Sequence, residues 1–503
     1  MSCVDFMAEA VYHRILKQLF FSYFVNIIVF IIVPLGTVVL SRGLSLVDFG
    51  VYSLFFIWWN IGLQICPLGF QMFIRNYLPG RSSSEQYTVV GSLFRVLFLV
   101  WIFALFTGIF FIEKFLSLLH LQGYFFEMIL VLIAVFISIL AFVVHGWITA
   151  RQELEFASFL FGVNSTVWII LSVIEFLLFG KLVLWHVTAY WIFGVSLQLV
   201  LSLLKFGKES RFLIFPFNID FSFVKNALYF GLPLTPLIVS QWLLTTFDRS
   251  LLSLYKGNEV LGLYALAYAL VSIVASFGNI VVNIFYPYVA QANNAGQKKE
   301  YSEFLNASLK YTLLVVVPGI AGVYVFGSEL ITLIASAKFI DGVIFVKYLL
   351  LFPLFSSLII VLQTAILVSK GSGSISIIYF FSFLLNYFLN RMLIPSYGGV
   401  GAALSTVITY FVLAVGLLVL SRGLFKFEWN FIKIGRIFVC AVFMAFVLSF
   451  FSPQTAVFKL LSILFGVFVY FLSIILCGVF GRQELSIAKN LLAEKIGKLY
   501  SFT

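Results

Sequence analysis

The chain has 503 residues, of which 62% are hydrophobic and only 10% are charged. A soluble domain carries about 25% charged residues, so no water-soluble fold could hide this much apolar side chain, and lipid must be the solvent for most of the chain. This composition excludes a cytosolic enzyme, a secreted disulfide scaffold and a nucleic-acid-binding domain.

The net charge of +11 is typical of a membrane protein whose Lys and Arg residues hold its cytoplasmic loops in place. Nucleic acid is therefore not an expected partner. The four cysteines are scattered and form no CxxC pair, so we expect no disulfide frame and no metal site. The first apolar run, Leu19 to Leu40, is too long for a cleavable signal peptide and is interpreted as the first membrane span.

Apolar runs long enough to cross the membrane indicate an all-α polytopic membrane protein. A helix needs about 20 apolar residues to cross the hydrocarbon core, and fourteen such runs are present. They are 19–40, 50–73, 88–112, 127–149, 158–180, 182–204, 228–250, 260–288, 310–334, 343–368, 374–394, 400–421, 436–452 and 457–480. The fifth and sixth are nearly fused at Gly180-Lys181, which predicts a very tight hairpin.

The distribution of basic residues sets the expected orientation. An even number of spans puts both termini on one side. Of the 31 Lys and Arg residues, 21 fall on that side, 8 on the other, and Arg95 and Lys347 within spans. Positive charge gathers on the cytoplasmic side, so we expect both termini in the cytoplasm.

Two stretches 212 residues apart resemble each other. Asp48-Phe49-Gly50-Val51-Tyr52 aligns with Val260-Leu261-Gly262-Leu263-Tyr264, which places spans one and two over spans seven and eight. A six-span offset keeps the orientation, so the pattern predicts a parallel repeat of two six-helix lobes. The predicted divisions are an N-terminal lobe 1–205, a cytoplasmic linker 206–227, a C-terminal lobe 228–421, two extra helices 436–480, and a basic amphipathic tail 481–503.

Ionisable groups within or beside the spans are the candidate functional residues, because they are costly in lipid and face protein or a wet cavity. Enzyme motifs such as HExxH, GxSxG and a phosphate loop are missing, so we expect neither catalysis nor a cofactor. Arg and Lys outnumber carboxylates among these groups, which favours an anionic ligand, and Arg binds phosphate bidentately. The candidate ligands for an anion are Arg42, Arg75, Arg95, Arg249, Lys347 and Arg391.

Carboxylates that could carry a proton or sodium ion through the membrane are few. Glu175 and Asp248 are the best candidates. We favour Glu175 for coupling and Asp248 for structure, because Asp248 stands beside Arg249 and an ion pair would hold it charged. The structural alternative for Glu175 is a pair with Lys181 across the tight hairpin.

Three segments resemble the Wzx-type oligosaccharide flippases of the multidrug/oligosaccharidyl-lipid/polysaccharide exporter superfamily. The first is Leu40-Ser41-Arg42-Gly43-Leu44-Ser45 leading into Asp48 to Leu54. The second is Tyr229 to Pro236, followed by Asp248-Arg249 and by Gly262 to Tyr268. The third runs from Asn386 through Arg391 and Pro395 to Tyr397-Gly398-Gly399 and Thr406. Their order and spacing carry the resemblance over roughly residues 15–421.

The resemblance implies two lobes in alternating access around a cationic central cavity. It implies that the substrate is an undecaprenyl-pyrophosphate-linked oligosaccharide. The protein would move this substrate from the cytoplasmic to the outer leaflet of a bacterial inner membrane for O-antigen or capsule synthesis. Membrane lipid, a polysaccharide polymerase and chain-length machinery are the implied partners. Many members have twelve spans, whereas fourteen is similar to the lipid II flippases, whose last two helices form a groove for the lipid tail.

Two other functions compete with a flippase. A cation-coupled small-molecule exporter of the same superfamily would be expected to use acidic groups, and the acid-poor spans argue against it. A membrane oligosaccharide polymerase or ligase usually carries a large outer loop with catalytic polar residues, whereas the longest outer loops predicted here are about a dozen residues.

Overall fold

The computed structural model describes residues 3–65, 67–213, 218–232, 235–370, 373–424, 431–451 and 455–480. Every regular element in these ranges is helical, as predicted. The first eight α-helices are α1 (Cys3–Gly43), α2 (Leu46–Ile65), α3 (Phe70–Tyr77), α4 (Ser83–Leu118), α5 (Phe125–Ala150), α6 (Leu154–Phe179), α7 (Leu184–Phe206) and α8 (Phe221–Gly231). The others are α9 (Thr235–Asn294), α10 (Lys298–Ile334), α11 (Val343–Leu349), α12 (Phe352–Lys370), α13 (Gly373–Tyr397), α14 (Gly399–Ser421), α15 (Phe431–Leu448) and α16 (Ala456–Leu476).

Twelve of the described helices are long and apolar enough to cross a membrane, so the chain is a multi-pass membrane protein. Helix α9 contains 60 residues and reverses at Gly257, where φ is 82°, so it accounts for two of the predicted spans. Helix α15 has 18 residues, the same length as the shortest of the twelve. The described helices therefore accommodate the fourteen spans predicted from the sequence.

The chain forms two compact units. One comprises the described residues up to Leu266 together with Ile334–Phe339 and Tyr379–Ala402. The other comprises Ala267–Leu333, Ile340–Ile378 and the described residues from Ala403 onward. This division follows packing rather than the predicted repeat, so the lobe and linker boundaries stay predictions. The predicted amphipathic tail 481–503 lies outside the described residues.

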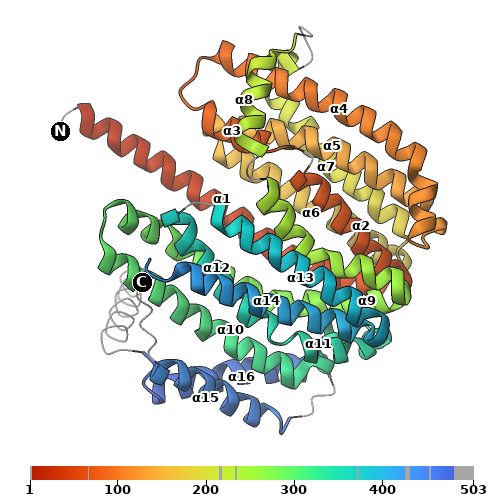
Figure 1. Cartoon of the computed structure of the whole chain (residues 1–503), viewed down its shortest axis with the longest axis vertical. Coiled ribbons are helices and arrows are strands. Elements are labelled where there is room, and N and C mark those ends of the chain that lie inside the picture. The colour runs from red at the N-terminus through yellow and green to blue at the C-terminus, as the bar shows by residue number, and fades with distance from the viewer. Residues whose placement is uncertain are drawn as a thin grey trace, which may run out of the picture. The chain divides into compact units, whose positions relative to one another are not determined.

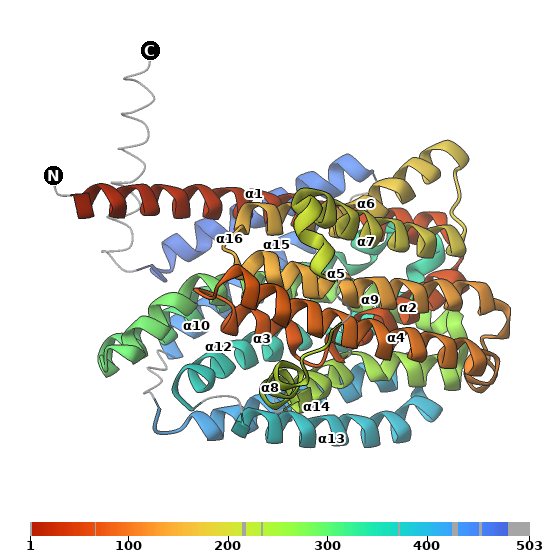
Figure 2. The same ribbon diagram turned by 90° about the horizontal axis from the view of Figure 1, so that it is seen from above.

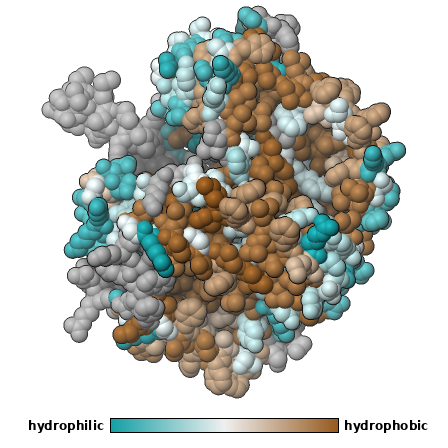
Figure 3. Space-filling model, in the orientation of Figure 1, coloured by the Kyte–Doolittle hydropathy of each residue, from teal (hydrophilic) through white to brown (hydrophobic). Residues whose placement is uncertain are grey.

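Helices α1 to α7 form the bundle of the first unit. Helix α6 lies against both α1 and α7, and α5 lies against α4 and α7 (Figure 1). Helix α4 shows how a membrane helix divides its faces: Val89, Leu93 and Leu97 are buried, whereas Phe103 and Phe110 are 70% and 81% exposed. Apolar side chains likewise dominate the molecular surface in the view of Figure 3, as expected for helices whose outer faces contact lipid.

The two aligned stretches meet in the first unit, where α2 crosses the second half of α9. A Cβ built on Gly50 would lie 2.1 Å from the Asn258 carbonyl oxygen, and one built on Gly262 would lie 2.3 Å from the Leu46 carbonyl oxygen. Leu46 and Asn258 are also 212 residues apart, so the contact is reciprocal between equivalent positions. Only glycine permits such an approach of two backbones.

A hydrogen bond across the reversal of α9 holds its two halves together. The Tyr264 hydroxyl donates to Asp248 Oδ2 at 2.6 Å, although sixteen residues of straight helix would separate their Cα atoms by about 24 Å. Asp248 is only 1% exposed, and its Oδ1 also accepts the backbone N–H of Arg249 at 2.8 Å. The chain must therefore turn back at Gly257.

The predicted hairpin between the fifth and sixth spans is confirmed. Helix α6 ends at Phe179, Gly180 adopts a left-handed φ of 70°, and α7 begins at Leu184. The Leu182 N–H donates to the Gly43 carbonyl at 3.0 Å, so the end of α1 anchors this turn.

In the second unit, α15 and α16 lie side by side (Figure 2). Ile437, Cys440 and Met444 of α15 are buried in a shared apolar core. The Tyr470 hydroxyl of α16 donates to the Leu314 carbonyl of α10 at 2.8 Å. Packing and this hydrogen bond therefore attach the two extra helices to the rest of the unit.

Candidate functional site

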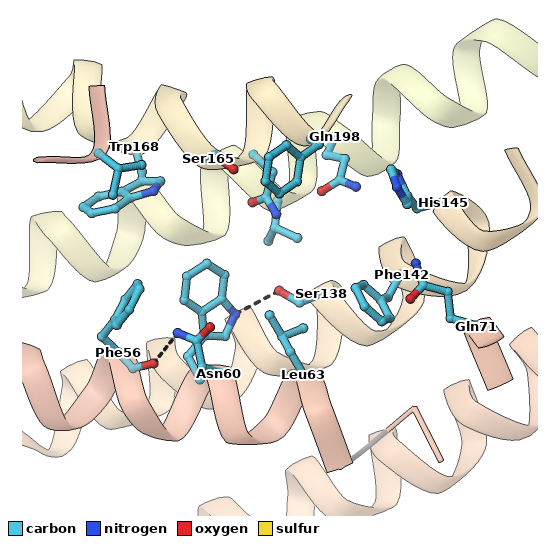
Figure 4. Close-up of a pocket in the computed structure, with 15 residues that line it drawn as sticks. Phe56, Asn60, Leu63, Gln71, Ser138, Phe142, His145, Ser165, Trp168 and Gln198 are labelled. Carbon is cyan, nitrogen blue, oxygen red and sulfur yellow. Dashed lines mark hydrogen bonds between the residues drawn. The ribbon is translucent and has the colours of Figure 1, made fainter. Parts of the chain in front are cut away.

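A cavity of about 290 Å³ lies inside the first unit, between α2 and α5 on one side and α6 and α7 on the other. Figure 4 shows Phe56, Asn60 and Leu63 on one wall and Ser165, Trp168 and Gln198 on the facing wall. Helices α1 and α3 contribute one residue each. The lining residues are Val33, Phe56, Trp59, Asn60, Leu63, Gln71, Ser138, Phe142, His145, Phe161, Asn164, Ser165, Trp168, Val195 and Gln198.

Aromatic rings support one end of the cavity. Trp59 stacks on Trp191, with ring centroids 5.2 Å apart and planes inclined by 15°. Trp168 meets Trp191 edge-on at 6.0 Å, and Phe56 contacts Trp59 at 6.0 Å. Each ring is therefore held by a neighbouring ring, so the cavity presents a rigid aromatic surface.

Amides and hydroxyls supply the polar part of the lining. The Trp59 indole N–H donates to Ser138 Oγ at 3.0 Å, and the Asn60 amide donates to the Phe56 carbonyl at 2.7 Å. In the described part of the chain, two other buried lining atoms, His145 Nδ1 and Asn164 Oδ1, have no hydrogen-bond partner. A buried polar atom without a partner is costly, so a turn of either side chain toward a polar guest in the cavity would be favoured.

Among the described residues, the lining includes no Lys, Arg, Asp or Glu. Arg75 follows the lining residue Gln71 by one turn of α3, and its charge acts on His145 of the lining. Arg75 lies on α3 and is exposed. The cavity itself is thus uncharged, with a guanidinium in electrostatic range of it.

The structure places Arg42 and Arg391 elsewhere in the first unit. The Arg42 Nε donates to the Ala335 carbonyl at 3.0 Å. The Arg391 Nη1 donates to the Tyr387 hydroxyl at 3.1 Å, and its side chain is exposed. Neither lines the cavity.

The other predicted cations differ in burial. Arg95 is 5% exposed. Its guanidinium lies beside Gly91 of the same helix and near the Phe212 carbonyl: a Cβ built on Gly91 would lie 2.6 Å from Nη2 and 2.8 Å from that oxygen. Arg249 is half-buried, and Lys347 is exposed in the second unit. Five of the six predicted cations thus lie in the first unit, and none of the five lines the cavity.

Glu175 is paired with a residue that the sequence argument did not select. Its Oε1 lies 2.5 Å from His186 Nδ1, and the carboxylate is 6% exposed. Tyr190, one helical turn beyond His186, also interacts with this carboxylate through its hydroxyl. The partner of Glu175 is thus a histidine of α7, and within the described residues Lys181 forms no salt bridge with it.

Charged side chains around the short 3-10 helix η2 (Gly207–Leu213) form a second cluster. Arg151 donates to Glu209 Oε2 at 2.9 Å, and this hydrogen bond lowers the pKa of Glu209. Glu153 pairs with Lys205, and the Tyr87 hydroxyl bonds Glu209 at 3.2 Å. The cluster ties η2 to the ends of α5, α6 and α7.

Sequence reasoning selected charges and therefore missed most of the cavity. The polar lining residues Asn60, Asn164 and His145 each lie in a different predicted span. Gln71, Ser138, Ser165 and Gln198, and the tryptophans 59 and 168, were not selected. Spacing offered one signal: Phe56, Trp59, Asn60 and Leu63 follow one helical face, at intervals of three and four residues.

Comparisons with known proteins place the chain among glycan-related membrane proteins. A family model described as a polysaccharide biosynthesis protein matches residues 15–293. A curated relative, the probable low-salt glycan biosynthesis flippase Agl15 of Haloferax volcanii, is 23% identical over 224 residues. The match covers 44% of this chain and 47% of Agl15, so the chain spans about half the length of that relative.

Two solved structures share the fold. A lipid II flippase MurJ structure, in an inward closed conformation, has a TM-score of 0.71 at 15% identity and covers 90% of this chain and 97% of its own. An inward-facing multidrug resistance MATE family transporter of the MOP superfamily has a TM-score of 0.62 at 14% identity, covering 81% and 94%. The predicted all-helical polytopic fold is confirmed.

Proposed function

Because the chain belongs to the polysaccharide biosynthesis protein family, we propose that it is a flippase for a lipid-linked oligosaccharide. Its substrate would be an undecaprenyl-pyrophosphate-linked repeat unit of a surface polysaccharide such as O-antigen or capsule. It would carry this unit from the cytoplasmic to the outer leaflet of a bacterial inner membrane, with both termini of the chain in the cytoplasm.

One observation carries this proposal: a cavity lined by amides, hydroxyls and aromatic rings lies inside a bundle of membrane helices. Polar side chains in such a bundle are costly unless protein, water or a ligand satisfies them. A saccharide offers many hydroxyl groups and an apolar ring face, which are the groups that this lining complements. A flippase needs such a surface, because its glycan must cross the hydrocarbon core.

The pyrophosphate head would be held by basic residues in a cationic central cavity. The proposed ligands remain Arg42, Arg75, Arg95, Arg249, Lys347 and Arg391. Arg75 is the best-supported candidate, because its charge acts on His145, which lines the uncharged cavity of the first unit. Alternating access of the two lobes would then expose the site to one leaflet at a time.

Glu175 is the proposed ion-coupling group, and the contact with His186 supports that role. Their hydrogen bond lies between α6 and α7, and a carboxylate and an imidazole together can hold one or two protons. Asp248 is the second candidate, but its contacts with Tyr264 and with the Arg249 backbone favour a structural role.

A polysaccharide polymerase and chain-length machinery are the proposed partners on the outer side, since the translocated unit must be consumed there. No catalytic step is assigned to this chain. Transport against a gradient would draw on an ion gradient or on removal of the product.

A complementation experiment tests this function. Cells that lack the gene should lose surface polysaccharide and accumulate the lipid-linked repeat unit, and the wild-type chain should restore the surface polymer. Arg75→Ala should restore it poorly at matched protein levels. Arg81→Ala is the matched control, because Arg81 lies six residues on and faces Glu85 at 3.7 Å. Normal surface polymer in cells lacking the gene would reject the function.

A further inference from the structure

The cavity in the first unit is lined, among the described residues, by side chains without a formal charge. We propose that it binds one uncharged sugar ring of the substrate and excludes the pyrophosphate and acidic sugars. The ring would lie against the aromatic surface formed by Phe56, Trp59 and Trp168. This inference rests on the proposed function and adds to it a ligand class and the residues that recognise it.

Charge is the first argument. A phosphate or carboxylate that enters a cavity without a cation loses its hydration and gains no ion pair. The lining of this cavity has no Lys or Arg in the described residues, and it also has no carboxylate. Anionic groups are therefore excluded, whereas an uncharged ring loses only hydrogen bonds to water, which amides and hydroxyls can replace.

The two buried atoms without partners give the second argument. Asn164 Oδ1 can only accept a hydrogen bond, and His145 Nδ1 can donate or accept according to its tautomer. Sugar hydroxyls donate and accept equally, and an acetamido group offers an N–H to an amide oxygen. One sugar ring in the cavity could contact both side chains, and Gln198, 6% exposed, lies with Ser165 on the wall formed by α6 and α7 (Figure 4).

Size and surroundings give the third argument. The volume of about 290 Å³ lies just below the range of roughly 300–1,000 Å³ found for small-molecule sites. One ring fits this space better than an oligosaccharide. Arg75 is outside the lining yet in electrostatic range of His145, so a phosphate held by Arg75 would leave the first sugar within reach of the cavity.

A binding experiment on the full-length protein in detergent tests the inference. Three probes are compared by tryptophan fluorescence: methyl N-acetylglucosaminide, methyl glucuronide and inorganic pyrophosphate. The uncharged glycoside should give a saturable change that persists in high salt. The glucuronide and pyrophosphate should give none in the same concentration range. Equal binding of the uncharged and acidic glycosides would overturn the proposal.

Variants then assign the residues. Asn164→Leu should weaken binding of the uncharged glycoside by about tenfold, the loss expected for one or two hydrogen bonds. Asn26→Leu is the matched control, because Asn26 is exposed and donates to the Ser22 carbonyl of its own helix at 2.8 Å. Equal affinity in both variants would overturn the assignment. If Asn164→Leu does not fold, the probe series on the wild type still decides the ligand class.

Flipping is measured in parallel on the same preparation. Intact translocation without glycoside binding would reject the sugar site and leave the flippase function standing. Glycoside binding without translocation of any lipid-linked glycan would reject the function and leave the site standing.

Discussion

Gly50 and Gly262 lie at equivalent positions, 212 residues apart, and each packs against the backbone of the other segment. If they were alanine, the Cβ of residue 50 would lie 2.1 Å and that of residue 262 would lie 2.3 Å from a backbone atom of the other segment. The obstructing atoms are the carbonyl oxygens of Asn258 and Leu46, which cannot rotate away as a side chain can. The crossing of α2 and α9 therefore depends on the two glycines. The aligned stretches of the sequence are the ones that meet.

The first prediction concerns that crossing. Gly50→Ala should separate the helices and destabilise the protein by about 1–3 kcal/mol, the usual cost of overpacking. Thermal unfolding of the purified protein in detergent measures the effect. Gly322→Ala in α10 is the control, because a Cβ there has no atom within 4 Å, and it should be neutral or slightly stabilising. Equal stability of the two variants would show that the crossing tolerates a methyl group.

The second prediction concerns the reversal of α9. Tyr264→Phe removes the hydroxyl that donates to Asp248 at 2.6 Å and should destabilise the protein by about 1–3 kcal/mol, because a buried carboxylate loses one of its hydrogen bonds. Tyr324→Phe, at a residue 65% exposed, should change little. A double-mutant cycle with Asp248→Asn should give a coupling energy above experimental error, and strict additivity would contradict the bond's contribution.

The third prediction concerns energy input. If Glu175 carries the coupled ion, Glu175→Gln should abolish the dependence of translocation on a pH or sodium gradient, and His186→Phe should weaken it. Asp248→Asn should leave that dependence intact in whatever fraction of protein folds. The measurement is translocation in vesicles under an imposed gradient. Full gradient dependence in Glu175→Gln would show that its coupling role is wrong.

The fourth prediction concerns topology. The distribution of basic residues places Gly123, Lys256 and Ser396 outside and Ser83, Lys208 and Lys298 inside. Reporter fusions at these six positions should follow that pattern, because positive loops stay in the cytoplasm. A reversed pattern at two or more positions would contradict the orientation.

Features of this fold were predictable from the sequence where they depend on the length of an apolar run or on glycine. The spans followed from apolar runs, the tight turn from Gly180-Lys181, and the alignment of Gly50 with Gly262 from residue matches at an offset of 212 positions. The reversal at Gly257 falls between two predicted spans. These features are local or periodic, so no knowledge of side-chain packing was needed to find them.

The cavity was not predictable in the same way. Trp59, Ser138 and Gln198 come from three helices, and no spacing in the sequence links them. Asn164 and Trp168 lie within one apolar run, where amides and tryptophans also occur as ordinary helix contacts. The structural alternative for Glu175, a pair with Lys181, was wrong for a related reason. Lys181 is nearer in sequence and opposite in charge, whereas the start of α7 brings His186 to the carboxylate.

Translocation by the purified chain in lipid vesicles tests the central claim most directly. Vesicles would contain undecaprenyl-pyrophosphate-linked glycan in both leaflets, and an external, membrane-impermeant glycosidase would report how much glycan reaches the outside. The wild type should raise the accessible fraction above that of protein-free vesicles. Ser165→Trp, which fills the cavity, should prevent the rise, whereas Phe103→Trp on the exposed face of α4 should not. An accessible fraction equal to that of protein-free vesicles, with folded wild-type protein present, would contradict the account.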